Sequence, residues 1–376
     1  MQFIDLKKQQ KRIESAVYRR IQDVLNHGAY IMGPEVFELE EKLAIHAGVK
    51  HCVSCSSGTD ALLMALLAYG VGPGDAVLTT PFTFVATAEA IALTGATPVF
   101  VDICEDTFNI DPEKLRDTLI HIDTHSPPGV AKQIHPRAII AVDLFGLPAD
   151  YDRINRIADE FGIFVLEDAA QSFGGLYKAK SACSLADIAA TSFFPAKPLG
   201  CYGDGGAVFT DDDEIAERLR SIRVHGQGED KYTNIRLGIN GRLDTIQAAI
   251  LLEKLTIFES EIEARQQVAQ MYSRYAPSGL KTPSIPDDCR SAWAQYSVRS
   301  ARRGRIQEAL KERQIPTAIY YPIPLHLQKA FDNLGYTQGA FPVSEYISKD
   351  IFSLPMHPYL QEEEISTIMR VIAETI

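Results

Sequence analysis

The chain has 376 residues, of which 46% are hydrophobic, so it can bury a large core and exceeds the size of one average domain. It carries 37 Lys and Arg against 49 Asp and Glu, a formal net charge of −12. That balance argues against binding to nucleic acid or to an anionic membrane surface. An anionic ligand would need a local pocket.

No apolar run reaches the roughly 18 residues that suggest a membrane span, and the first residues lack the apolar stretch of a signal peptide. We expect a cytoplasmic protein with no membrane partner. The six cysteines form no disulfide framework, and the nine histidines form no metal-binding motif, so we expect reduced thiols and no metal. Cys52 and Cys55 could be redox-active or half of a zinc site. Positions three apart on a strand face opposite sides, however, which favours a structural role.

Short apolar runs alternate with amphipathic stretches from about residue 50 to residue 210. The runs predict strands at 51–55, 76–80, 97–103, 137–146, 163–170, 188–194 and 206–210. Between them, one helix is predicted to begin at Thr59 and to end at Gly70, and another has Asp111 as its N-cap. Strands that alternate with helices indicate an α/β protein with a mostly parallel sheet covered on both faces.

The pattern changes after Asp244. Residues 245–275 keep a helical periodicity that could carry the chain out of its first domain. The remainder predicts strands at 293–300 and 317–321 and helices at 305–314 and 362–376, which form a compact α+β set. We therefore predict a large domain of residues 1–258 and a smaller C-terminal domain of residues 259–376.

Ligands of parallel sheets bind beyond the carboxyl ends of the strands, so the residues that follow each apolar run are candidates for chemistry. After the first run, residues 56–59 make a turn into a helix, and its free N–H groups could hold a phosphate. Ordinary helix capping is the alternative. Asp168 follows another apolar run, where a carboxylate stays ionised only if it meets a cation, although it could also be a helix N-cap.

A lysine, Lys197, lies among aromatic residues, prolines and glycines in SFFPAKPLGCYGDGG. A lysine in apolar company either reaches to solvent or is used chemically, because burial lowers the pKa of the amine and makes it nucleophilic. Phe84 follows a further strand and could stack on a flat ring, although an aromatic there is usually core. A turn that could hold a phosphate (residues 56–59, the phosphate cup), an aromatic side chain that could stack on a ring, a carboxylate and a lysine together match what pyridoxal 5′-phosphate requires.

The sequence resembles a known family, the nucleotide-sugar aminotransferases of the DegT type, which are fold type I pyridoxal-phosphate enzymes. The resemblance covers nearly the whole chain. It rests on the segments FIDLKKQQ, IMGPEVFELEEKLA, SSGTDALLMAL, PFTFVATAEAI, EDAAQSFGG, SFFPAKPLGCYGDGGAVFT, GINGRLDTIQAAIL, YYPIPLHLQKAF and SLPMHPYL. It implies a mostly parallel central sheet between helices, followed by a smaller C-terminal α+β domain.

The resemblance also implies a set of cofactor-binding residues: Gly58, Thr59, Phe84, Asp168, Gln171, Ser192, Lys197 and Asn240. Lys197 would capture the cofactor and then move the proton, and Asp168 would pair with the ring nitrogen. Gln171 would donate to the phenolic oxygen of the cofactor, and Phe84 would stack on its ring. Asn240 would reach the phosphate from a second subunit, which implies a homodimer with shared active sites.

The presence of a lysine, where some family members carry histidine and act as dehydratases, implies amino transfer, with glutamate as donor. The resemblance favours members that aminate UDP-2-acetamido-2-deoxy-3-oxo-glucuronate at C3 for bacterial surface polysaccharides such as the O-antigen. Four residues are candidates for binding the sugar nucleotide: Arg242, Tyr320, Tyr321 and His326. The closest relatives are expected to carry His-Tyr where this chain has Tyr320 and Tyr321.

Three other functions compete with this one. A family member that acts on a 4-oxo-hexose linked to UDP or dTDP has the same residue types. A non-catalytic regulator that binds the cofactor would be expected to have lost part of the site, and here the set is complete. A dehydrogenase of the Rossmann type needs a glycine-rich fingerprint after an early strand, which the sequence lacks.

Overall fold

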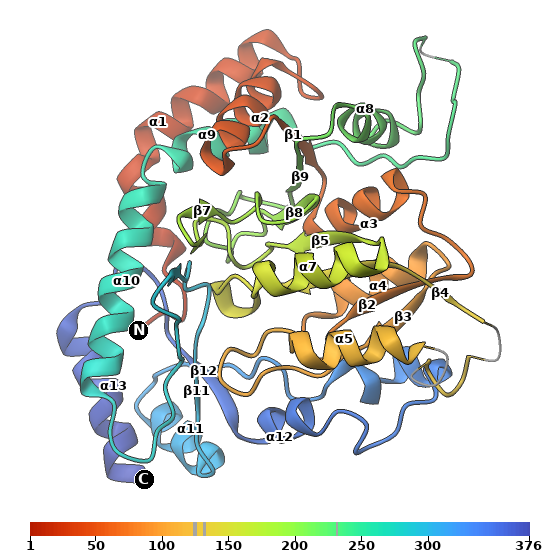
Figure 1. Cartoon of the computed structure of the whole chain (residues 1–376). Helices are drawn as coiled ribbons and strands as arrows, with labels where there is room; N and C mark the ends of the chain where they lie inside the picture. The colour runs from red at the N-terminus through yellow and green to blue at the C-terminus, as the bar shows by residue number, and fades with distance from the viewer. Residues whose placement is uncertain (123–125, 131–132, 231) are drawn as a thin grey trace.

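A seven-stranded sheet forms the centre of the molecule (Figure 1), in a computed structural model that describes residues 1–122, 126–130, 133–230 and 232–376. Its strands are β1 (His51–Cys55), β2 (Asp75–Thr79), β3 (Thr97–Phe100), β4 (His135–Val142), β5 (Phe164–Asp168), β8 (Ile188–Ser192) and β9 (Gly206–Thr210). Their order across the sheet is β1-β9-β8-β5-β4-β2-β3. Only β9 runs against its neighbours, so the prediction of a mostly parallel sheet is confirmed.

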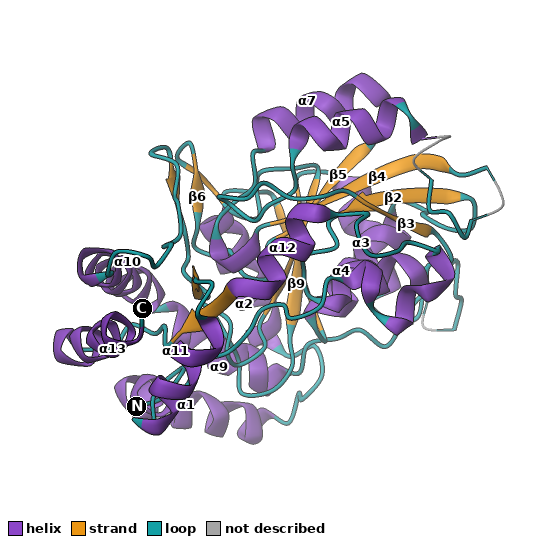
Figure 2. Ribbon diagram, turned by 90° about the horizontal axis from the view of Figure 1, so that it is seen from below, coloured by secondary structure: helices purple, strands orange, loops and turns teal. Residues whose placement is uncertain are grey.

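Helices cover both faces of this sheet (Figure 2). The apolar sides of α3 (Gly58–Ala68), α4 (Val85–Leu93) and α8 (Asp213–Ile222) pack on one face. On the other face, α5 (Pro112–Ile120) and α7 (Tyr151–Phe161) cover β2 to β5. The α2 (Pro34–Ala47) and α9 (Thr245–Leu255) helices cover β1, β8 and β9 on that face. Both faces are therefore dry, which explains why the strands appear in the sequence as unbroken apolar runs.

Two predicted helix starts are confirmed by their caps. The Asp111 side chain accepts from the backbone N–H of Glu113 at 2.9 Å and begins α5. The α3 helix begins at Gly58, one residue before its predicted start, and its N-cap Ser57 accepts from the N–H of Asp60 at 3.0 Å. Each cap satisfies an amide that the first turn of a helix leaves without a partner.

The C-terminal part of the chain builds a second apolar cluster around Tyr272, Tyr296 and Phe352. Its elements are α10 (Phe258–Tyr275), β11 (Tyr296–Arg299), α11 (Arg303–Glu312), α12 (Pro342–Asp350), β12 (Ile351–Leu354) and α13 (Glu362–Thr375). The β11 and β12 strands pair antiparallel. The α10 and α13 helices pack together along the side of the molecule that also carries α1 (Leu6–His27), at the left of Figure 1. The division into domains at residue 258 stays a prediction.

The helical periodicity of residues 245–275 forms two helices, because α9 ends at Leu255 and α10 begins at Phe258. One prediction for this region is wrong. Residues 317–321 do not form a strand; Ala318 makes only an isolated bridge to Ser353. A small three-stranded sheet of β6 (Leu176–Tyr177), β7 (Lys180–Ser181) and β10 (Cys289–Arg290) was not predicted, since its strands are too short to show a period.

Cys52 and Cys55 lie on opposite faces of β1, as the strand period predicts. Cys52 packs in the cluster that contains Phe209, and Cys55 packs in the cluster that contains Val208. Both are buried free thiols, and burial raises the pKa of each. Within the described residues, no helix has the length and apolar character that crossing a bilayer requires, and no group of side chains is arranged to hold a metal ion.

Candidate active site

The first feature of the site is a close contact between the start of α3 and the end of β8. A Cβ placed on Gly58 would lie 2.6 Å from the Cβ of Ser192. One placed on Gly206, where β9 begins at the same edge of the sheet, would lie 2.4 Å from the carbonyl oxygen of Ser57. Only glycine allows the backbones to approach this closely. The contact brings the Ser192 hydroxyl beside the first turn of α3.

The first turn of α3 presents amides that can bind an anion. Ser57 caps the amide of Asp60, but among the described residues nothing accepts a hydrogen bond from the amides of Gly58 and Thr59. Free amides and the positive end of a helix dipole attract a phosphate. Capping and anion binding therefore coexist in this turn. The backbone N–H of Ser56 donates to the carbonyl of Gly241 at 3.1 Å, which fixes the segment that holds Asn240 and Arg242 beside this turn.

Asp168 ends β5 and is 5% exposed. Its Oδ2 accepts from Thr87 Oγ1 at 2.8 Å, and its Oδ1 accepts from the backbone N–H of Ala170 at 3.3 Å. Burial raises the pKa of Asp168, and these two hydrogen bonds and the charge of Lys197 oppose that rise. A cation that approached this carboxylate would be stabilised in its charged form.

Lys197 lies in the turn that follows β8, where its backbone N–H donates to the carbonyl of Phe194 at 2.8 Å. Its side chain is half-buried, and no carboxylate of the described residues lies within 4.0 Å of its ammonium group. Desolvation lowers the pKa of Lys197, and the charge of Asp168 partly opposes this effect. An amine with a lowered pKa is more often neutral and therefore nucleophilic near pH 7.

Gln171 follows Asp168 by three residues and is held at both ends of its amide. Its Oε1 accepts from the backbone N–H of Phe145 at 2.7 Å, and its Nε2 donates to the hydroxyl of Tyr321 at 3.2 Å. The ring of Tyr321 lies 6.4 Å from that of Phe84, which is 55% exposed. A side chain this large and this exposed is available to stack on a flat ligand.

The remaining predicted residues lie in different surroundings. Asn240 is exposed, and Arg242 is half-buried with an Nε that has no partner among the described residues. Tyr320 packs beside Tyr321, with their ring centroids 5.8 Å apart. His326 is only 2% exposed; its Nε2 lies 3.0 Å from Glu345 Oε1, and its ring packs edge-on against another aromatic ring. The side chain of His326 is therefore buried, and its predicted contact with the sugar stays a prediction.

Comparison with known families matches residues 11–373 to the DegT/DnrJ/EryC1/StrS aminotransferase family. The chain belongs to this family. It is 51% identical over 369 residues, 98% of each chain, to the UDP-2-acetamido-2-deoxy-3-oxo-D-glucuronate aminotransferase of Pseudomonas aeruginosa. The crystal structure of a DegT DnrJ EryC1 StrS aminotransferase from Brucella abortus superposes with a TM-score of 0.95 at 49% identity and covers 100% of this chain and 99% of its own.

A third relative is a solved structure that is named as the PLP form of its protein. The PLP form of the putative sugar aminotransferase Spr1654 from Streptococcus pneumoniae has a TM-score of 0.86 at 26% identity, with 96% of this chain and 97% of its own covered. The predicted family, fold and enzyme class are thereby confirmed: this chain is an aminotransferase of the DegT/DnrJ/EryC1/StrS family with the fold of type I enzymes.

Sequence reasoning missed Thr87, the donor to Asp168. Thr87 lies in the first turn of α4, three residues after Phe84, and that position was the available signal. It also assigned no role to Glu167 and did not consider Asp143, and both are buried behind Asp168. Their partners are distant in the chain, so the local sequence gave no signal.

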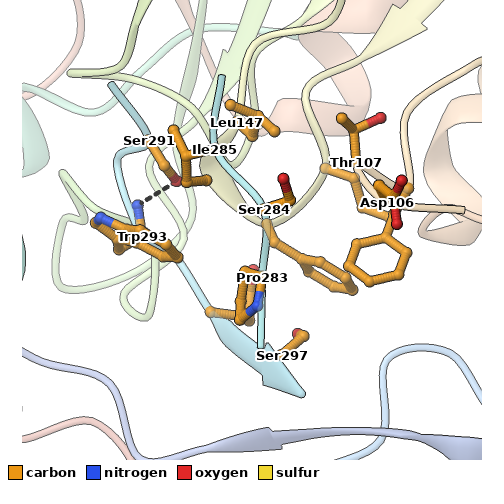
Figure 3. Close-up of a pocket in the computed structure, with 13 residues that line it drawn as sticks. Asp106, Thr107, Leu147, Pro283, Ser284, Ile285, Ser291, Trp293 and Ser297 are labelled. Carbon is orange, nitrogen blue, oxygen red and sulfur yellow. Dashed lines mark hydrogen bonds between the residues drawn. The ribbon is translucent and has the colours of Figure 1, made fainter. Parts of the chain in front are cut away.

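A small cavity of about 20 Å³ lies nearby, between residues 106–108, 144–147 and 283–297 (Figure 3). Its wall is mostly apolar, and the Ser291 hydroxyl accepts from the backbone N–H of Trp293 at 3.0 Å. It has room for about one water molecule, which Gln295 Oε1, an atom with no hydrogen-bond partner among the described residues, could bind. The cavity is therefore too small to be the substrate site.

Replacing Gly58 by alanine tests the close packing of the phosphate cup. The added Cβ is fixed to the backbone and would meet the Ser192 Cβ, so α3 must shift away from β8. We expect the free energy of unfolding to fall by about 1–3 kcal/mol in urea denaturation. The control is Gly304→Ala, whose Cβ would meet no atom within 4 Å and should change stability by less than about 1 kcal/mol. Wild-type stability of Gly58→Ala would contradict the packing.

Proposed function

We propose that this enzyme binds pyridoxal 5′-phosphate and transfers an amino group from glutamate to C3 of UDP-2-acetamido-2-deoxy-3-oxo-glucuronate. The observation that carries the proposal is that a buried carboxylate, Asp168, and a half-buried lysine, Lys197, influence each other's pKa through their charges, beside the free amides of α3. The name of the 51% identical relative supports the choice of sugar. The product would serve a bacterial surface polysaccharide such as the O-antigen of lipopolysaccharide.

The residues at the strand ends fit this cofactor. The amides of Gly58 and Thr59 and the hydroxyl of Ser192 would hold its phosphate, in the cup that only glycine permits. Asp168 would pair with the ring nitrogen, and Phe84 would stack on the ring. When bound, the cofactor supplies an aldehyde that captures amines and a ring that withdraws electrons from the carbon attached to them.

The side chains of this chain would then orient the cofactor and move protons. The Asp168 carboxylate would keep the ring nitrogen protonated, because burial makes the field of its charge strong. Gln171 Nε2 would donate to the phenolic oxygen, with its Oε1 held by the amide of Phe145. Lys197 Nζ would take a proton from the donor carbon and return it to the cofactor carbon, which requires the neutral amine that desolvation favours.

For the sugar nucleotide, Arg242 is our candidate to bind the carboxylate of the uronate. A guanidinium binds a carboxylate through two parallel hydrogen bonds, and the Arg242 Nε has no partner among the described residues. Tyr321, which already contacts Gln171, and its neighbour Tyr320 would line the sugar side of the site. All six cysteines are free, which suits the reducing cytoplasm, where we infer that the enzyme acts.

We infer a homodimer with shared active sites. The segment between α8 and α9 projects from the molecule (Figure 1) and is held by bridges from Val224 to Asn240 and from Gln227 to Asn234. It exposes Leu237 at 91%, an apolar surface that a second copy would cover. Asn240 at its base would then reach the phosphate of the partner's cofactor.

Two half-reactions test the activity and the sugar together. The visible spectrum of the protein with pyridoxal phosphate should lose its band when glutamate is added. The band should return with UDP-2-acetamido-2-deoxy-3-oxo-glucuronate made in place. Lys197→Ala is the control and should show neither change, because it lacks the amine that captures the aldehyde. If only a 4-oxo sugar restores the band, the amino transfer stands and the 3-oxo substrate is wrong.

Arg242→Ala tests the carboxylate contact. We expect kcat/KM for the uronate to fall roughly tenfold to a hundredfold further than for the neutral 3-oxo sugar, the range for one charge-assisted contact. Arg242→Lys, which keeps the charge but loses the planar fork, should recover part of this difference. Equal losses for both sugars would show that Arg242 does not bind the carboxylate.

Subunit complementation tests the shared site. We expect Lys197→Ala and Asn240→Ala homodimers each to be impaired. A mixed dimer contains one site with both Lys197 and Asn240 intact, so random mixing should restore about a quarter of wild-type activity. The readout is the amino-transfer rate at limiting cofactor, with each variant alone as control. A rate equal to the average of the two variants would mean that each site is built from one chain.

A further inference from the structure

Two carboxyl groups with no assigned role are buried behind the strand ends. Asp143 follows β4, Glu167 lies in β5, and both are fully buried. Glu167 immediately precedes Asp168, so its side chain leaves the strand on the opposite face. Ala141 lies opposite Glu167 in the pairing of β4 with β5, so Asp143, two residues further on, and Glu167 leave neighbouring strands on the same face, where burial and their interaction raise the pKa of Glu167. A direct contact between the two carboxyls would require at least one proton between them, because two carboxylates have only acceptors.

Hydrogen-bond donors surround both groups. Glu167 Oε1 and Oε2 accept from the backbone N–H groups of Cys183 and Leu185 at 2.6 and 3.0 Å. Asp143 Oδ1 accepts from the N–H of Ala149 and from the hydroxyl of Tyr151, both at 2.9 Å. Its Oδ2 accepts from the hydroxyl of Ser172 at 2.7 Å. Two of the three donors to Asp143 are hydroxyls from other elements, which favours the ionised form at Asp143.

No cation among the described residues compensates the charge of the pair. The titratable groups that face it are Tyr151 on α7, the Cys183 thiol and Asp168. Burial raises the pKa of Tyr151 and of Cys183, and the charges of the two carboxyls add to this rise. No lysine, arginine or histidine of the described residues forms an ion pair with either carboxyl. Burial raises the pKa of both Asp143 and Glu167. Two charges cannot both persist there, so one proton stays on the pair near neutral pH.

We propose that Asp143 and Glu167 share one proton, with Glu167 as donor, and act as a positioning pair for the segment of residues 168–172. The backbone N–H of Asp143 donates to the carbonyl of Asp168 at 3.1 Å, and its carboxylate holds Ser172, the neighbour of Gln171. Asp143 therefore holds, through its backbone and its carboxylate, the segment that carries both residues proposed to bind the cofactor ring.

The pair would also act through its charge. A single negative charge behind Asp168 adds to the field that keeps a bound cation protonated, whereas a neutral pair would not. The two carboxyls therefore have separable effects. Replacing Asp143 removes the negative charge of the pair, whereas replacing Glu167, which carries the proton, leaves that charge in place. A measurement of this effect through the cofactor rests on the function proposed above.

The first experiment compares Asp143→Asn with Glu167→Gln in the presence of pyridoxal phosphate, by titrating the visible cofactor band with pH. Asp143→Asn should lower the midpoint by roughly 0.5–1 pH unit, because it removes a buried negative charge behind Asp168. Glu167→Gln keeps the net charge and should leave the midpoint unchanged. Glu345→Gln, a buried carboxyl next to His326, is the matched control. Equal shifts in the first two variants, or none in either, would overturn the proposal.

The second experiment needs no cofactor, so it separates this proposal from the proposed function. The pKa of each carboxyl is raised in the folded protein, so above about pH 4 the unfolded chain has lost protons that the folded pair retains. Stability must then fall as pH rises. The drop in Tm between about pH 5 and pH 8 should be larger for the wild-type apoprotein than for the double variant D143N/E167Q.

An equal drop in both proteins would overturn the shared proton, whatever the cofactor experiment gives. A wild-type protein with no visible band, but with the expected difference in the drop of Tm, would instead reject the proposed function and leave the shared proton standing. If the double variant does not fold, each single variant should show part of the reduced pH dependence, because each removes one of the two titrating groups.

Discussion

The site depends on one electrostatic constraint, the burial of an ionisable carboxylate at the end of β5. Asp168 is almost entirely out of water, where a charge without a partner is costly. The protein supplies a threonine hydroxyl, one backbone amide and the charge of Lys197, which lower this cost but do not remove it. The carboxylate therefore favours any ligand that brings a positive charge. The same burial lowers the pKa of the lysine that faces it.

Parallel strands place the buried carboxylate beside the other residues of the site, because they bring residues that are distant in the chain to one edge of the sheet. The β1, β5 and β8 strands end at the same edge of the sheet, so the start of α3, Asp168 and Ser192 converge there. The glycine contacts at Gly58 and Gly206 bring the backbones closer than any side chain would permit. The anion site and the carboxylate are thus two results of one packing arrangement.

Buried ionic groups also hold the regions around the site. Arg223 donates to Glu40 on α2 and to the carbonyl of Ser54 in β1, and its own carbonyl accepts from the amide of Gly241. The segment that carries Asn240 and Arg242 is in this way tied to the strand that leads into the phosphate cup. Buried pairs of this kind add little net stability, but they fix geometry because breaking one leaves an uncompensated charge.

Much of the fold was determined by the sequence alone. Strands buried on both faces are continuous apolar runs, and the helices between them begin at side-chain caps such as Asp111, so both signals are local. Lys197 and Asp168 were also recognisable, because a charged residue in an apolar stretch conflicts with its surroundings unless it has a function. The family resemblance added the roles.

Only the tertiary structure decided what depends on distant partners. It broke the helical periodicity of residues 245–275 after Leu255, and it left residues 317–321 with a single bridge instead of a strand. It enclosed His326 beside Glu345, and it joined Thr87 to Asp168 and brought Asp143 near Glu167 across gaps in the sequence. A local pattern shows which residues are apolar or charged. Whether a polar group meets a partner, a ligand or nothing depends on contacts that form only when the whole chain folds.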